Sequence, residues 1–109
     1  MWDKISEEVY LTAFDHGFIE KGTFTDKDSC QALAMMHSEI SECIEALRSG
    51  NKINVNQSFI GYFDEELELA DLLIRVMVYA KRKGYDLPGA ILAKNEYNKT
   101  RPHKHGKKF

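Results

Sequence analysis

The sequence predicts an all-α protein whose four main helices form a bundle completed by dimerisation. Apolar residues recur at intervals of three and four, and no segment sustains the apolar–polar alternation of a half-buried strand. With 109 residues, 43% of them apolar, the chain is long enough for one domain with its own core. One expected helix is apolar nearly all round, and its neighbours in a single chain give it too little cover. A symmetric dimer, or a dimer of dimers, would supply that cover.

The first two helices have recognisable start and stop signals. We expect the first over residues 3–20, with a rough apolar stripe and Gly22 as its stop. The second follows a cap at Thr25 and continues to Gly50. Its apolar stripe is spaced for a helix and consists of Leu33, Met36, Ile40, Cys43 (or Ile44) and Leu47. Residues 51–58 are polar, contain three asparagines and predict a loop.

The third helix is the most apolar element of the sequence. It is predicted over residues 64–83, with Gly84 as its stop, and an apolar segment at residues 59–63 leads into it. Asp86 then caps a fourth helix over residues 87–99, with a proline in its first turn. The sequence therefore predicts one helical domain over residues 1–101 and a basic tail over residues 102–109.

The composition argues against several classes of protein. No apolar run approaches the roughly 20 residues that span a bilayer. The N-terminal residues lack the apolar stretch of a signal peptide. A formal net charge of −2 gives no general case for nucleic-acid binding. We expect a cytoplasmic protein without membrane contact.

Two pairs of carboxylates occur at the same spacing on the second and third helices. Glu39 and Glu42 lie three residues apart on one, and Glu68 and Asp71 repeat that spacing on the other. Residues three apart are neighbours on a helix surface. With successive residues about 100° apart around the axis, Glu39 borders the apolar stripe centred on Ile40.

Acids in these positions need a partner. Like charges side by side in dry surroundings repel each other and lose hydration, which is costly unless they are paired. Mg²⁺ offsets both effects because it binds carboxylate oxygens and keeps some of its waters. The alternative is that all four acids are solvated on polar faces, with Asp71 paired to Arg75 one turn further on. The matched spacing on two apolar helices favours the metal site.

The patterns of other metal and nucleotide sites are missing. No glutamate has a histidine three residues later, as a di-iron bundle requires. His37 and Glu39 have the H-x-E spacing of zinc deaminases, but no P-C-x-x-C follows. The sequence also contains no G-x-x-x-x-G-K-[ST], so any nucleotide would bind without a P-loop.

The four acids and their flanks resemble a known signature. Glu39-x-x-Glu42 and Glu68-x-x-Asp71, separated by residues 43–67, are similar to the ExxE…ExxD motif of the all-α nucleoside triphosphate pyrophosphohydrolases, the MazG-like group. The run from Lys94 to Lys107 is similar to the end of small single-domain members and to a helix of the related dimeric dUTPases. The resemblance covers roughly residue 32 to the C-terminus.

This resemblance implies a dimeric helical enzyme that hydrolyses a nucleoside triphosphate to its monophosphate and pyrophosphate, for the control of nucleotide pools. It implies that Glu39, Glu42, Glu68 and Asp71 hold Mg²⁺, with Mn²⁺ as a substitute. Metal ions would bridge the carboxylates and the triphosphate, since both are negative, and would activate a water. Glu42 is our candidate for the residue that takes the proton of that water.

The C-terminal region supplies candidate substrate ligands. Lys94, Asn98 and Arg101 are spaced four and three apart and share one helix face. Their side chains offer positive charge and hydrogen-bond donors to phosphate oxygens. Three residues of the tail would meet the outer phosphates, namely Lys104, His105 and Lys107. A nucleobase would stack on aromatic residues of the segment 59–63 or of the first helix, namely Trp2, Tyr10, Phe14 and Phe18. The alternative is that these aromatic residues belong to the core.

Two other functions stay open at this point. One is a non-catalytic helical dimerisation module with the same fold. The other is nucleic-acid binding by the basic C-terminal region, which from residue 94 onward has six Lys and Arg against one acid, a net charge of +5. The preceding residues carry a net charge of −7, and the alternative for such a basic run is a solvated tail without a binding role.

Overall fold

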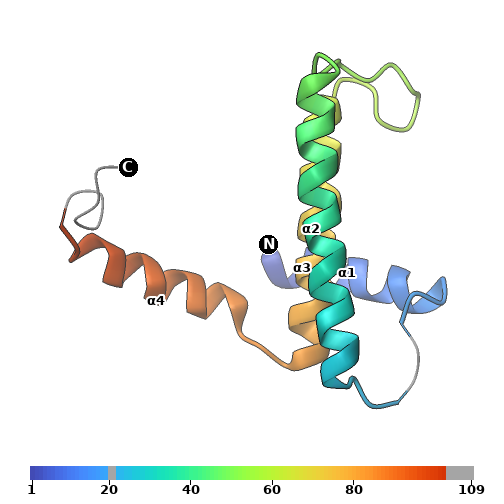
Figure 1. Cartoon of the computed structure of the whole chain (residues 1–109). Coiled ribbons are helices and arrows are strands. Elements are labelled where there is room, and N and C mark those ends of the chain that lie inside the picture. The colour runs from blue at the N-terminus through green and yellow to red at the C-terminus, as the bar shows by residue number, and fades with distance from the viewer. Residues whose placement is uncertain (20–21, 103–109) are drawn as a thin grey trace.

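The computed structural model describes residues 1–19 and 22–102, and these residues form four helices (Figure 1). The helices are α1 (Trp2–Asp15), α2 (Asp26–Arg48), α3 (Asp64–Lys83) and α4 (Leu87–Lys99). The described residues contain no strand, only an isolated bridge between Ile53 and Phe63. The predicted all-α class with four main helices is confirmed. None of these four helices is both long enough and apolar enough to cross a bilayer.

The antiparallel pair of α2 and α3 is the centre of the molecule. The two helices lie side by side along most of their lengths (Figure 1). α1 crosses α3 near the C-terminal end of α3 (Figure 1). Met77 and Ala80 of α3 are buried, as is Ser6 of α1. Glu7 of α1 forms an ion pair with Lys81 of α3, so that polar contacts border this junction.

The predicted start of α2 is confirmed by a capping box. The Thr25 hydroxyl accepts a hydrogen bond from the Asp28 backbone N–H at 3.2 Å, and the Asp28 carboxylate accepts one from the Thr25 N–H at 2.9 Å. The backbone hydrogen bond from Thr25 lowers the pKa of Asp28, with a further contribution from the Thr25 hydroxyl. Two otherwise orphaned donors at the helix start are thereby satisfied.

The predicted end of the first helix is wrong. α1 ends at Asp15 because Gly17 takes the left-handed conformation, with φ of 78°. The Phe18 N–H then donates to the Ala13 carbonyl at 2.9 Å, which closes the helix end. Ile19 turns back and is buried. The stop is therefore Gly17 and not Gly22.

The bounds predicted for the third and fourth helices are confirmed. Gly84 ends α3 in the left-handed conformation, and the Asp86 side chain caps α4 by accepting from the Gly89 N–H at 3.0 Å. The residues between α2 and α3 form a loop, as predicted. Its two arms are joined by hydrogen bonds from Asn54 N–H to the Tyr62 carbonyl and from Asp64 N–H to the Lys52 carbonyl.

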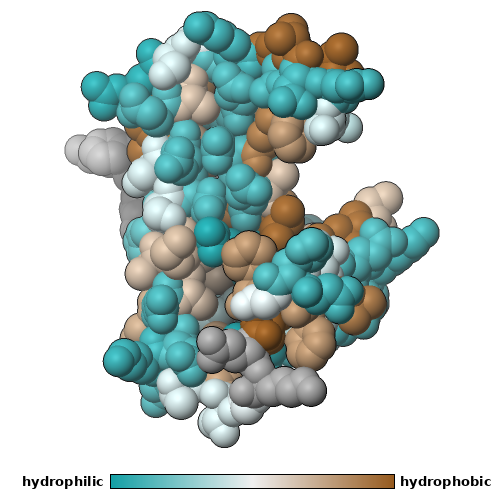
Figure 2. Space-filling model, turned by 90° about the vertical axis from the view of Figure 1, so that its right-hand side faces the viewer, coloured by the Kyte–Doolittle hydropathy of each residue, from teal (hydrophilic) through white to brown (hydrophobic). Residues whose placement is uncertain are grey.

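A single chain leaves much apolar surface uncovered. The expected burial of the α2 stripe centred on Ile40 is wrong for one chain, since four of its residues are 44–52% exposed, namely Leu33, Ile40, Ile44 and Leu47. α4 points away from the other helices, and residues 90–100 are all exposed (Figure 1). Figure 2 shows more apolar surface over the α2–α3 loop at the top of the molecule, above a hollow.

Candidate metal centre and its cavity

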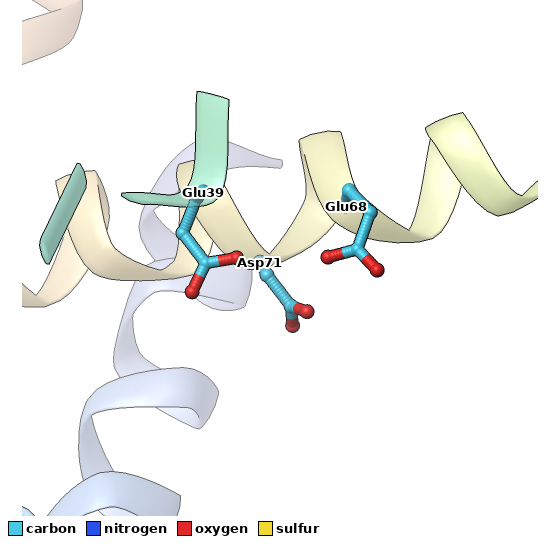
Figure 3. Close-up of side chains that lie close together, drawn as sticks. All are labelled: Glu39, Glu68 and Asp71. Carbon is cyan, nitrogen blue, oxygen red and sulfur yellow. The ribbon is translucent and has the colours of Figure 1, made fainter. Parts of the chain in front are cut away.

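Three of the four predicted acids meet between the two central helices. Glu39 from α2 and Glu68 and Asp71 from α3 each offer a carboxylate oxygen, and these oxygens all lie within 4.8 Å of one another (Figure 3). Glu68 and Asp71 reach the same place because they are three residues apart on one helix. We call these three residues the acid trio.

The electrostatics of the acid trio are those of crowded like charges. Partial burial raises the pKa of Glu68, and the carboxylates of Asp71, Glu42 and Glu39 raise it further. The pKa of Asp71 is also raised, first by desolvation and then by Glu39, although Asp71 belongs to the exposed residues. Ionised together, these acids destabilise one another unless a cation joins them.

Glu42 lies beside the acid trio but is not one of its members. It is exposed on α2, and its charge contributes to the raised pKa of Glu68. The structure therefore brings together three of the four predicted ligands. A set of carboxylate oxygens without nitrogen or sulfur suits a hard cation such as Mg²⁺, which completes its shell with water. The donor set thus fits the expected metal.

One arginine faces the acid trio. The Arg75 Nε donates to Oε1 of Glu39 at 2.9 Å, and the two side chains are 39% and 11% exposed. The alternative in which Arg75 pairs with Asp71 on the same helix is not what the structure shows, because Arg75 of α3 pairs with Glu39 of α2. Arg75 still acts on Asp71, because its positive charge lowers the pKa of that carboxyl and opposes the effect of burial.

A cavity of about 710 Å³ begins at the acid trio and is lined by residues of α1, α2 and α3 and of the segment between α1 and α2. This volume lies in the usual range of small-molecule sites, roughly 300–1,000 Å³. Glu39 and Asp71 line it, and Arg82 lies eleven residues beyond Asp71 on α3, about 16 Å further along the axis. The cavity therefore extends from an acidic end at Glu39 and Asp71 to a second end at Arg82.

The distant part of the cavity is aromatic. Phe24 and Tyr79 pack edge to face with ring centroids 5.8 Å apart, and the Arg82 guanidinium lies 4.1 Å from the centroid of Phe24. Phe18 also lines the cavity. Flat, apolar walls of this kind are able to stack a planar ligand ring.

The predicted aromatic residues divide among different places. Phe18 lines the main cavity, whereas Tyr10 and Phe14 line a smaller hollow of about 290 Å³. Residues 59–63 line neither of these two hollows. Sequence reasoning missed Phe24 and the continuation of the α3 face. The α3 face could have been found from the series Asp71, Arg75, Tyr79 and Arg82, whose members are spaced four, four and three residues apart.

Three of the predicted C-terminal ligands do not meet the acid trio within one chain. Lys94, Asn98 and Arg101 are exposed, and α4 is directed away from the α2–α3 pair (Figure 1). The predicted shared helix face is wrong for Arg101, because α4 ends at Lys99. Lys94 and Arg101 nevertheless both lie over the ring of Tyr97, at 5.6 and 5.7 Å from its centroid. The other three predicted substrate ligands lie outside the described residues: Lys104, His105 and Lys107.

A comparison of the chain with known protein families, with curated proteins and with solved structures finds no match.

Without metal, Glu68→Gln is expected to raise the melting temperature near pH 7, because a neutral amide is not repelled by the other acids. The pKa of Glu68 is higher in the folded than in the unfolded chain, so its ionisation destabilises the fold at neutral pH and its protonation relieves this. The gain over the parent should shrink as the pH falls toward about 4, the ordinary carboxyl range. Thermal melts in EDTA across this pH range measure the difference.

The matched control is Glu45→Gln, which removes an exposed acid of α2 outside the acid trio and should change the melting temperature little. A Glu68→Gln protein less stable than the parent near pH 7, or a gain that does not depend on pH, would contradict the electrostatic account.

Proposed function

We propose that the chain is a Mg²⁺-dependent nucleoside triphosphate pyrophosphohydrolase, with Mn²⁺ as a substitute metal, that acts in nucleotide-pool control. The observation that supports this best is the meeting of Glu39, Glu68 and Asp71 beside a cavity of about 710 Å³ that two of them, Glu39 and Asp71, line. Carboxylates alone repel a triphosphate, and bound Mg²⁺ supplies the charge neutralisation and water activation that hydrolysis of a phosphoanhydride needs. The ExxE…ExxD spacing gives independent support.

The residues of the chain divide the remaining tasks. The aromatic part of the cavity, with Phe18, Phe24 and Tyr79, holds the nucleoside. A water oxygen attacks the α-phosphorus, and the bond from this phosphorus to the oxygen that bridges to the β-phosphorus breaks. The monophosphate and pyrophosphate are the products. Glu42 takes the proton of the water, because it is exposed and lies beside the acid trio.

We further propose that two chains form a symmetric dimer, alone or as half of a dimer of dimers. The exposed α2 stripe and the uncovered α4 support this, because a soluble chain rarely leaves so much apolar surface to water. In this dimer, α4 of one chain packs on its partner. Lys94, Asn98 and Arg101 then reach the phosphates held at the partner's acid trio, which they do not approach in their own chain.

Glu42→Gln is expected to lower kcat for release of pyrophosphate by about 100-fold or more, because removal of a general base costs 10²–10⁴-fold. Asp71→Asn should lower it as strongly, because it removes one charged oxygen from the acid trio. Both substitutions nearly preserve side-chain volume, so the proteins should fold. Pyrophosphate and inorganic phosphate are measured separately, with a panel of dNTPs and Mg²⁺.

Glu45→Gln is the control for loss of a nearby surface charge and should keep the parent's activity. Near-normal turnover in Glu42→Gln or Asp71→Asn would remove that residue from its proposed role. A folded parent that releases no pyrophosphate would instead favour the non-catalytic dimerisation module.

Mixing two inactive variants tests the contribution of α4. Asp71→Asn and Arg101→Ala proteins are refolded together, and random pairing should restore about a quarter of the parent's activity, because one site of each mixed dimer keeps both residues. Light scattering should give a particle of at least twice the 12.6 kDa chain mass. No restored activity would show that α4 serves its own chain, and an active 12.6 kDa monomer would contradict the dimer.

A further inference from the structure

Arg75 occupies the position between the acid trio and the aromatic part of the cavity. It follows Asp71 by four residues on α3 and precedes Tyr79 by four, and all three line the cavity. Successive residues at this spacing advance along one helix face by about 6 Å. A molecule that extends from the aromatic walls to the acid trio must therefore pass the Arg75 side chain.

The contact with Glu39 uses only part of the guanidinium. Nε donates to Oε1 of Glu39 at 2.9 Å, and within residues 1–19 and 22–102 the two terminal NH₂ groups of Arg75 donate no hydrogen bond to a side chain or carbonyl. Arginine carries five N–H donors in a fixed fork, so four of them remain for another partner. The Arg75 side chain is 39% exposed and that of Glu39 is 11% exposed. A further partner would therefore approach the ion pair from the side of Arg75.

The ion pair alone is a weak explanation for Arg75. A partly exposed ion pair contributes little to stability, and one Nε contact is not the two-pronged geometry that gives arginine–carboxylate pairs their strength. The free fork suits a tetrahedral anion with several acceptor oxygens, which phosphate is. The cavity holds another arginine, Arg82, but its guanidinium is stacked on Phe24 in the aromatic part.

We infer that Arg75 binds the α-phosphate of the nucleotide through its terminal NH₂ groups while its Nε keeps Glu39 in place. This inference rests on the proposed function. With the nucleoside against Phe24 and Tyr79 and the reacting bond at the acid trio, the phosphate joined to the sugar is the one nearest Arg75. Because the α-phosphate stays on the monophosphate, Arg75 contacts the product as well as the substrate. The α4 residues, by contrast, serve the phosphates that leave as pyrophosphate.

Arg75→Lys separates this role from the ion pair, because lysine keeps the charge and the reach to Glu39 but has no fork. Isothermal titration with Mg²⁺ present compares the parent and the variant in their affinity for the four canonical deoxynucleoside monophosphates and for pyrophosphate. Monophosphate affinity should fall about tenfold or more, as expected for lost charge-assisted hydrogen bonds, while pyrophosphate affinity stays within about twofold. Arg48→Lys, an exposed arginine at the end of α2, is the control and should change neither.

Two results overturn the inference: unchanged monophosphate affinity in Arg75→Lys, or a loss confined to pyrophosphate. If Arg75→Lys fails to melt like the parent in EDTA, the same titrations with Arg75→Gln decide the question. Failure of the proposed function has a different signature, because the parent itself then releases no pyrophosphate from any dNTP and binds none of the monophosphates.

Discussion

Repulsion within the acid trio is the constraint on which the site depends. Glu39, Glu68 and Asp71 are brought within 4.8 Å by the packing of α2 on α3, and the same packing removes part of their hydration. Arg75 is the counter-charge that the described residues place on Glu39, and it is half-exposed and bonded through one nitrogen. In the proposed function, a cation held by these three acids would relieve their repulsion, and the cavity beside them would hold the substrate.

The exposed apolar surface follows from the same arrangement. The face of α2 that meets α3 carries buried Glu39 and Cys43, and four other residues of the predicted apolar stripe are left exposed, namely Leu33, Ile40, Ile44 and Leu47. α4 points away from the pair in its own chain, and its residues 90–99 are exposed (Figure 1). A second copy would cover the stripe and would bring positive side chains to an acidic site, so the proposed assembly and the proposed chemistry support each other.

The sequence predicted most of the fold because most helix boundaries are set by residues close to them in the sequence. Thr25, Gly84 and Asp86 cap or end helices through contacts with residues at most a few positions away. The end of α1 was misplaced because Gly17 and Gly22 are both plausible stops, and the buried position of Ile19 decides between them only through tertiary packing.

The site was predictable only in part, because its geometry depends on how α2 and α3 are aligned. The spacing of Glu68 and Asp71 placed both on one face, but the meeting with Glu39 and its pairing with Arg75 depend on the register between two helices. The burial of the α2 stripe was predicted wrongly for a related reason. Apolar residues for contact inside the chain and for the proposed contact between chains lie side by side on one helix, so hydrophobic periodicity alone does not tell which are buried in a single chain.

The most direct test of the metal centre is a crystal structure of the full chain grown with Mn²⁺, with data collected at the manganese absorption edge. The account predicts an anomalous peak between α2 and α3, in contact with carboxylate oxygens of Glu39, Glu68 and Asp71. A structure in which manganese binds elsewhere, and these three carboxylates hold no ion, would contradict it.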